Sequence, residues 1–275
     1  MTTSGGTTGR GIDHIVLASR DLDGLAAQYE GLGFTLTPKA YHEDRMGTSN
    51  RLAQFTGRNF IELLEVDRPQ TVMDPGPGGF AFGAFLRSYL SAREGLGMVV
   101  FRTDDARADI AAWRAKGLDT YDPFDFERQA TLPDGSQVTV GFSLGFVTSP
   151  LMPELAFFVC QNRAQEHFWK PAFQTHDNDA HEITAITLAA DDPAAHAAFL
   201  SGLFNGEVTT IGCGISVACG PHRLDICTPD SLSDTAAAAA QEPGRAVGLE
   251  IRAPARAGAL TPADKAGGMF IQWVG

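Results

Sequence analysis

Short apolar segments surround one amphipathic segment between residues 11 and 66. Residues 12–17 and 59–66 are apolar runs of strand length. Each contains one polar residue that commonly binds metals, His14 in the first run and Glu62 in the last. Side chains alternate between the two faces of a strand, so each of these residues shares a face with apolar neighbours. The two runs are predicted to be the first and last strands of one structural module.

An amphipathic helix is predicted between these strands. Its apolar stripe consists of Leu22, Leu25, Ala26, Tyr29 and Leu32. Asp21 is a suitable N-cap, and Gly33 is suited to the C-terminal end of the helix. Residues 34–38 and 48–55 follow as two further short strands. The predicted order of elements is therefore β-α-β-β-β.

A second module with the same order is predicted downstream. A Pro- and Gly-rich connector and a helix over residues 80–92 precede it. Its elements are a strand at residues 98–101, a helix capped by Asp104, a hairpin that turns at residues 133–136, and a last strand at residues 155–160.

A third module repeats the apolar pattern of the first strand. Ala185 takes the place of His14 in this repeat, and Asp225 falls where Glu62 falls in the first module. Because no histidine accompanies it, Asp225 is expected to pair with Arg223 or to face solvent. Two later apolar runs are predicted to be the first and last strands of a fourth, truncated module.

These modules divide the chain into four regions. Residues 1–10 are rich in Thr, Ser and Gly, contain no apolar segment of the signal-peptide kind, and are expected to be a flexible lead-in. Residues 11–165 form a domain of two modules, residues 166–180 a connector, and residues 181–275 a second module pair. The predicted fold class is α+β, with about three and a half to four βαβββ modules that form paired cupped sheets.

The composition is that of an acidic globular protein. The formal net charge is -12 over 275 residues, and 44% of the residues are hydrophobic. An excess of acidic residues disfavours nucleic acids and anionic membranes as partners. No apolar run approaches the about 20 residues that a membrane-spanning helix needs. We expect a cytoplasmic protein with a small-molecule ligand, either monomeric or a homodimer.

Four cysteines, Cys160, Cys213, Cys219 and Cys227, form no CxxC pair and lie in apolar, strand-like contexts. Reduced and buried thiols are expected from this pattern, as in the cytoplasm. A zinc cluster formed by the last three cysteines is the alternative.

His14 and Glu62 are the main candidates for chemistry. An ionised carboxylate on an apolar face is costly unless a metal, an arginine or a proton compensates its charge. Neutral imidazole together with carboxylate suits Zn, Fe, Mn, Co or Ni. The alternatives are that His14 is a packed or hydrogen-bonded core residue, and that Glu62 pairs with an arginine such as Arg51.

The order of several short motifs resembles the vicinal oxygen chelate superfamily, which includes glyoxalase I, extradiol dioxygenases, and bleomycin- and fosfomycin-resistance proteins. The motifs are residues 12–17, 21–23, 32–34 and 60–63. Further matches resemble its glyoxalase-like branch: His42 with residues 47–52, then residues 155–159, 168–169 and 174–178. The resemblance covers residues 11 to about 185.

The resemblance implies paired modules around a cupped, half-open sheet, with metal ligands on the first and last strands of a module. In this chain those positions are His14 and Glu62. The second module lacks the ligands, because Gly97 aligns with His14 and Ala156 or Phe157 aligns with Glu62. Candidates to complete a metal site are His42, Gln161 and His176, none of which stands at a standard ligand position.

Three functional hypotheses follow. In the first, the protein is an enzyme in which His14 and Glu62 hold a divalent metal (Zn, Fe, Mn, Co or Ni). The metal binds two neighbouring oxygens of a small molecule, and the reaction is of the lyase, isomerase or dioxygenase type. Glu62 is also the candidate catalytic base. In the second, the same cup is a metal-free small-molecule binding or resistance protein. In the third, His14 and Glu62 hydrogen-bond to each other or to Arg51, and the site has lost its function.

Residues near the cup are predicted to bind the ligand. They are His42, Asn50, Arg51, Phe158, Trp169 and His176. Arg51 would contact an anion, and the alternative is an ion pair with Glu62 or Glu65. Trp169 and His176 lie in a polar and aromatic segment that would cover the cup, or would only connect the two module pairs.

Overall fold

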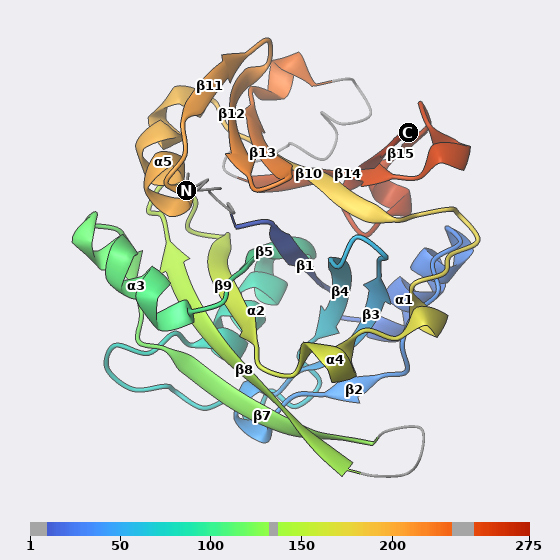
Figure 1. Cartoon of the computed structure of the whole chain (residues 1–275), viewed down its shortest axis with the longest axis vertical. Helices are drawn as coiled ribbons and strands as arrows, with labels where there is room; N and C mark the ends of the chain where they lie inside the picture. The colour runs from blue at the N-terminus through green and yellow to red at the C-terminus, as the bar shows by residue number, and fades with distance from the viewer. Residues whose placement is uncertain (1–9, 132–136, 233–244) are drawn as a thin grey trace, which may run out of the picture.

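The computed structural model describes residues 10–131, 137–232 and 245–275, which form two β-sheets with helices around them (Figure 1). The strands of the first sheet are β1 (Ile12–Ala18), β2 (Ala40–Tyr41), β3 (Ser49–Gln54), β4 (Phe60–Glu65), β5 (Gly95–Arg102), β6 (Asp119–Thr120), β7 (Phe124–Thr131), β8 (Gln137–Thr148) and β9 (Ala156–Asn162). Those of the second sheet are β10 (Glu182–Ala189), β11 (Val208–Ile211), β12 (Gly214–Cys219), β13 (His222–Cys227), β14 (Arg245–Arg252), β15 (Leu260–Thr261) and β16 (Phe270–Val274).

Helices connect or cover these strands. The α-helices are α1 (Leu22–Gly31), α2 (Phe82–Ala92), α3 (Ala106–Ala115), α4 (Gln165–Phe168) and α5 (Ala197–Phe204). Short 3-10 helices are η1 (Asp44–Met46), η2 (Pro171–Phe173), η3 (Pro193–His196), η4 (Pro229–Ser231), η5 (Pro254–Arg256) and η6 (Ala263–Lys265). Among the residues that the structure describes, no helix is long and apolar enough to cross a membrane.

The strand pairing repeats a modular pattern in both sheets. The first sheet has the order β2-β3-β4-β1-β5-β9-β8-β6, with β7 paired to β8, and the second has the order β11-β12-β13-β10-β14-β16-β15. In each sheet the first strands of two modules are antiparallel neighbours, β1 with β5 and β10 with β14. Each first strand is also parallel to the last strand of its own module. The predicted α+β fold of repeated modules is confirmed, and η5 and η6 stand where the fourth module would have its α-helix.

A shared apolar core joins the two sheets. Residues of both halves belong to one buried cluster, in which the ring of Phe101 meets Phe204 at 4.6 Å and that of Phe157 meets Phe199 at 5.3 Å. Each large side chain that is fully buried contributes about 1.5–3 kcal/mol of transfer free energy. Asn59 adds polar contacts, because its side chain donates to the Ile183 carbonyl and accepts from the Ile183 amide, both at 2.9 Å. A second buried cluster lies on the other face of the first sheet.

Two elements differ from the sequence prediction in ways that their contacts explain. Residues 34–38 are not a strand, and only the short β2 pairs with β3 at this edge. Pro38 has no N–H to donate, and within residues 34–38 it is Thr37 that bonds to β3: its amide donates to the Leu52 carbonyl and its Oγ1 accepts from the Leu52 amide. The cap of α3 is Asp105 rather than Asp104, since its carboxylate accepts from the amides of the first turn. The predicted turn at residues 133–136 lies outside the described residues.

The expectation of four reduced thiols is wrong for one pair. Cys213 and Cys227 form a disulfide, with 4.8 Å between their Cα atoms. The pairing of β12 with β13 places Gly214 opposite Cys227, so the preceding cysteine is a diagonal neighbour across two adjacent strands. Cys160 and Cys219 are free and buried. The two bonded cysteines are therefore not ligands of the alternative zinc cluster.

Candidate functional site

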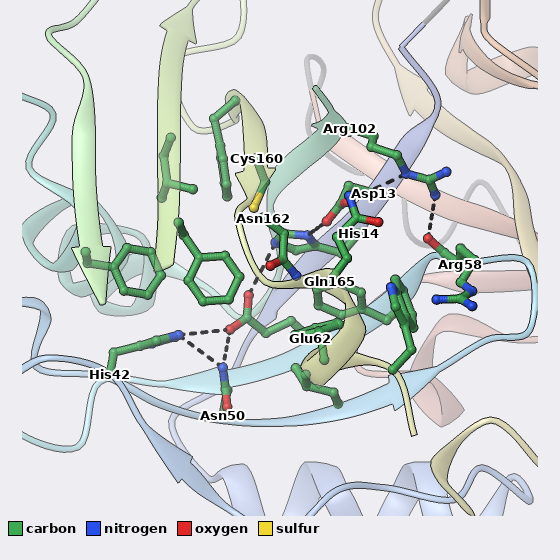
Figure 2. A pocket seen from close by; sticks show the side chains of 18 of the residues that line it. Asp13, His14, His42, Asn50, Arg58, Glu62, Arg102, Cys160, Asn162 and Gln165 are labelled. Carbon is green, nitrogen blue, oxygen red and sulfur yellow. Dashed lines mark hydrogen bonds and ion pairs between the residues drawn. The ribbon is translucent and has the colours of Figure 1, made fainter. Parts of the chain in front are cut away.

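A cavity of about 350 Å³ opens on the concave face of the first sheet (Figure 2). Its polar lining consists of Asp13, His14, His42, Asn50, Arg58, Glu62, Arg102, Asn162 and Gln165, together with Cys160. Its apolar lining consists of Met46, Leu52, Phe60, Phe82, Phe126, Phe142, Leu144, Phe158, Phe168 and Trp169. The structure thus brings six sequence candidates, His14, His42, Asn50, Glu62, Phe158 and Trp169, to one site.

Glu62 lies at the centre of the polar residues in Figure 2. Strand alternation directs its side chain to the concave face, and the residue is only 6% exposed. Asn50 on the neighbouring strand donates from Nδ2 to Glu62 Oε1 at 2.5 Å. The same Asn50 amide also donates to His42 Nε2 at 3.1 Å. The Glu62 carboxylate is therefore held on one oxygen, while Oε2 is directed towards His14.

His42 belongs to the same hydrogen-bond chain. Because its Nε2 accepts from Asn50, the proton is on Nδ1, which donates to Thr48 Oγ1 at 2.8 Å. Its Nε2 is 3.5 Å from Glu62 Oε1. These contacts with Asn50 and Thr48 fix the imidazole of His42 at the edge of the cavity, beside Glu62.

His14 is oriented by its own neighbour in the chain. Its Nδ1 donates to Asp13 Oδ1 at 2.7 Å, and its Nε2 is 3.6 Å from Glu62 Oε2. Two consecutive strand residues normally face opposite sides, but the register of β1 with β5 shifts between Ile12 and His14. Asp13 is the extra residue of this β-bulge, and bulges next to sites re-aim side chains. Phe60 stacks on the His14 imidazole at 4.3 Å.

Two arginines occupy another part of the cavity wall. Arg102, at the end of β5, has its Nε 3.9 Å from Asp13 Oδ2, and its Nη2 donates to the backbone carbonyl of Arg58. Arg58 lies in the turn between β3 and β4, and its guanidinium lies 5.5 Å from the ring centre of Trp169. Figure 2 shows both arginines on the side of Glu62 away from His42.

Aromatic rings form a continuous wall between these two ends. Successive ring-centre distances are 6.0 Å from Trp169 to Phe60, 5.2 Å from Phe60 to Phe168, 6.4 Å from Phe168 to Phe142, and 4.9 Å from Phe142 to Phe126. Phe126 then meets His42 at 6.0 Å. The cavity therefore suits a flat or apolar ligand body that carries a few polar groups.

His14 and Glu62 are suitable as two of the ligands of a metal ion. The donor set is one imidazole nitrogen and one carboxylate oxygen, and the far nitrogen of the imidazole is bound by a carboxylate, as in many metal-binding histidines. Within the described ranges, no group of three or more His, Cys, Asp or Glu side chains is arranged to hold a metal ion. The remaining coordination positions would therefore fall to water or to a ligand.

The second module supplies apolar residues at the corresponding positions. Matching the two helix N-caps, Asp21 and Asp105, places Met98 where the first module has His14. The strand registers then place Phe158 where the first module has Glu62. The sequence alignment with Gly97, and with Ala156 or Phe157, is thus shifted by one or two residues. Met98 and Phe158 both belong to the apolar cluster on the concave face.

The third module confirms the predicted pairing of Asp225. The β10–β13 register places Asp225 opposite Thr187, as Glu62 is opposite Val16 in the first module. Arg223 Nε donates to Asp225 Oδ2 at 2.9 Å, and Ser216 donates to Oδ1 at 2.6 Å. This carboxylate is compensated by an arginine, which Glu62 is not.

Arg51 and His176 do not reach the cavity, contrary to the prediction. Asn50 faces the cavity, so Arg51 faces the other side of β3, where its Nη2 is 3.4 Å from Asp23 Oδ1. His176 is buried elsewhere: its Nδ1 accepts from the Thr35 amide at 3.0 Å and its Nε2 donates to the Gln54 carbonyl at 2.8 Å. Burial lowers the pKa of His176, partly offset by the bond to Gln54. It is a neutral structural residue.

Gln161 is also absent from the cavity lining. Its Nε2 donates to the Asp104 carbonyl at 2.6 Å, and its Oε1 accepts from the Ala106 amide at 3.4 Å. Gln161 therefore supports the start of α3 and does not complete a metal site.

Sequence reasoning did not identify Asp13, Arg58 and Arg102 as cavity residues. The position of Asp13 directly before a candidate ligand was a usable signal, but the bulge that turns it inward was not visible in the sequence. Cys160 lines the cavity as well, and burial, with the nearby charges of Asp13 and Glu62, raises the pKa of its thiol well above the usual range. Cys160 is therefore protonated and is not an activated nucleophile.

Comparisons with known proteins agree with this architecture. The sequence model of a glyoxalase-like domain matches residues 12–204, so the chain belongs to the glyoxalase-like domain family of the vicinal oxygen chelate superfamily. No curated protein sequence gives a significant match.

Solved structures share the fold at low sequence identity. A hypothetical protein from Staphylococcus aureus is 14% identical, with a TM-score of 0.72 over 96% of this chain and 100% of that chain. A mutant of 4-hydroxymandelate synthase from Streptomyces coelicolor is 11% identical, with a TM-score of 0.52 over 90% and 71%. The Mn(II)-bound glyoxalase from Novosphingobium aromaticivorans is 12% identical, with a TM-score of 0.51 over 90% and 67%.

Proposed function

We propose that this protein is an enzyme that binds a small organic molecule with neighbouring oxygens in the cavity, with a divalent transition metal on His14 and Glu62. The observation that carries the proposal is the approach of His14 Nε2 to Glu62 Oε2, at 3.6 Å. Asp13 accepts the Nδ1 proton of His14, so in the neutral imidazole Nε2 is a lone-pair donor. Two lone-pair atoms so close together are best satisfied by a shared cation.

The bound metal would act as a Lewis acid towards the neighbouring oxygens of the substrate. The side chains around it have separate tasks. Asp13 holds His14 in one tautomer and one orientation, and Asn50 fixes Glu62 through Oε1. With Oε2 directed into the cavity, Glu62 is also the group placed to accept a proton from a bound substrate. The surrounding aromatic rings exclude water from the polar centre.

The lyase, isomerase or dioxygenase reaction is not decided by these residues, since all three use the same pair of substrate oxygens. The glyoxalase that shares the fold was solved with Mn(II), which supports Mn(II) as the first metal to test.

A metal-free small-molecule binder is the second candidate function. The observation in its favour is that the described residues offer two metal ligands at the site, while half of the lining residues are apolar and seven of these are aromatic. In that protein His14 is held by its contacts with Asp13 and Glu62 without a metal. The two candidates differ in whether the purified protein retains a metal.

Elemental analysis of protein purified without chelator or metal-affinity resin tests the first proposal. We expect about one equivalent of a transition metal in the wild type and little in His14→Ala and Glu62→Gln. The matched control is Asp225→Asn, because Asp225 occupies the position of Glu62 in the second sheet and is compensated by Arg223. No retained metal, together with no thermal shift on adding Mn, Fe, Co, Ni or Zn, overturns the metal-dependent function and leaves the binder.

A further inference from the structure

One arginine on the cavity wall, Arg58, is not paired with a carboxylate of the described residues, unlike Arg102. Asp13 is engaged by His14 and lies 3.9 Å from the guanidinium of Arg102, so these charges compensate each other. Glu62 is held by Asn50 and faces His14. Arg58 has no carboxylate partner among residues 10–131, 137–232 and 245–275, and its contact is with the Trp169 ring. One positive charge on the cavity wall is left for a ligand.

The Arg102 side chain is held against the turn that carries Arg58. Arg102 Nη2 donates to the carbonyl of Arg58, so the backbone of one residue is tied to the guanidinium of the other. Arg58 is exposed and the Arg102 side chain is 38% exposed, so both guanidiniums are accessible to an anion that enters the cavity. Arg58 also has a φ of +64°, a left-handed conformation that Gly or Asn adopts at lower cost.

We propose that the cavity takes a monoanionic organic acid with an aromatic or flat apolar body, and that Arg58, with Arg102, binds its carboxylate. The body lies along the aromatic wall that begins at Trp169, beside Arg58, and leads through Phe60 towards Phe126. Guanidinium forks match carboxylates in geometry. Glu62 keeps a negative charge in the same cavity when no metal is bound, and this charge disfavours a phosphate dianion more than a monoanion. This inference deepens the proposed function, because it names the substrate class of the same cavity.

Calorimetric titration of the metal-free protein, prepared with a chelator and desalted, tests the inference. The ligands are 3-phenylpropanoate, its neutral amide and phenyl phosphate. We expect the wild type to bind the acid with a Kd of about 1 mM or tighter, at least about tenfold tighter than the amide and tighter than the phosphate. In Arg58→Gln the preference for the acid over the amide should fall to within about twofold, with the amide unchanged.

Arg58 is chosen because it contacts neither His14 nor Glu62, whereas a change at Arg102 would also release Asp13. The control is Arg87→Gln on α2, a residue outside the cavity lining, which should keep the wild-type preference. Equal affinities for acid and amide, an unchanged preference in Arg58→Gln, tighter binding of phenyl phosphate, or no binding of the acid each overturn the proposal.

The outcomes for the two proposals are independent. Metal content is measured on protein without ligand, and the acid is titrated into protein without metal. A chain that keeps the acid preference but retains no metal supports the carboxylate subsite and the binder function. If the protein binds metal but has equal affinity for the acid and the amide, the proposed enzyme function stands and the proposed carboxylate subsite is overturned.

Discussion

The carboxylate of Asp13 and the imidazole of His14 line the same cavity, with 2.7 Å between Oδ1 and Nδ1, although the two residues are consecutive in a strand. The bulge that permits this is repeated in the third module, where the register shifts between Ile183 and Ala185. There the extra residue is Thr184, which donates to Glu250 at 2.7 Å. The side chain at the bulge position sets the local contact: a carboxylate that holds His14 in the first module, and a hydroxyl that bonds to Glu250 in the third.

Asp13→Asn should weaken metal binding by about 10–100-fold, because an amide is a poorer acceptor for the Nδ1 proton and no longer fixes the tautomer of His14. Competition with a chromophoric chelator measures the affinity. Asp23→Asn is the control, since its side chain is 74% exposed and pairs with Arg51 on the other face of β3. Equal losses in the two variants, or no loss in Asp13→Asn, would contradict an orienting role for Asp13.

Strand alternation and the order of elements were sufficient to predict the paired modules and to place His14 and Glu62 on one face. These features depend on local periodicity, which the sequence displays directly. The same rule applied from Asn50 would have placed Arg51 on the opposite face, so that error came from the family motif and not from the strand pattern.

Other parts of the site depend on contacts that no local pattern encodes. The bulge at Asp13 arises from the pairing of β1 with β5, which are far apart in the chain. His176 bonds to Thr35 and to Gln54, so its structural role follows from packing of the connector against the first module. The Cys213–Cys227 disulfide likewise required the register of β12 with β13, which apolar composition cannot fix.

Thiol titration should show two classes of cysteine. In the native protein without reductant, we expect almost no reaction, because burial raises the pKa of both free thiols, Cys160 and Cys219. Unfolding in denaturant should expose these two, and reduction should then add Cys213 and Cys227. Mass spectrometry after differential alkylation identifies each pair. Four reactive thiols in denaturant before reduction would show that the disulfide is absent from the isolated protein.

His176→Ala should destabilise the fold without changing ligand or metal binding. The substitution removes the partners of two buried backbone groups and leaves a void beside Phe34 and Phe55, whose rings lie 5.6 Å and 5.2 Å from the imidazole. The expected loss in the free energy of unfolding is about 2–4 kcal/mol, measured by urea denaturation at pH 7.5. His167→Ala, with a 30% exposed side chain, should cost less than about 0.5 kcal/mol. If His176→Ala binds 3-phenylpropanoate more weakly than the wild type under conditions in which both proteins are fully folded, His176 contributes to ligand binding, contrary to this prediction.

The stability of the protein should fall as the pH drops below 6.5, and His176 should account for part of that fall. Burial lowers the pKa of His176 in the folded protein, opposed by its bond to Gln54, whereas the unfolded chain protonates near 6.5. The unfolded state therefore binds more protons in the window below 6.5, so the free energy of unfolding rises with pH there. His176 makes its full contribution to the free energy of unfolding above pH 6.5. This contribution is lost as the pH falls through the lowered pKa of His176 in the folded protein.

Urea denaturation of the wild type and His176→Gln at several pH values between about 5 and 8 isolates this contribution. Burial also lowers the pKa of His196 and His222, so both proteins should lose stability in acid. Because Gln does not titrate, the wild type should lose more than His176→Gln as the pH falls, and the gap between them should narrow. A gap that is constant with pH would mean that His176 is not held neutral by burial, and a gap that widens in acid would mean that the folded state favours its protonated form.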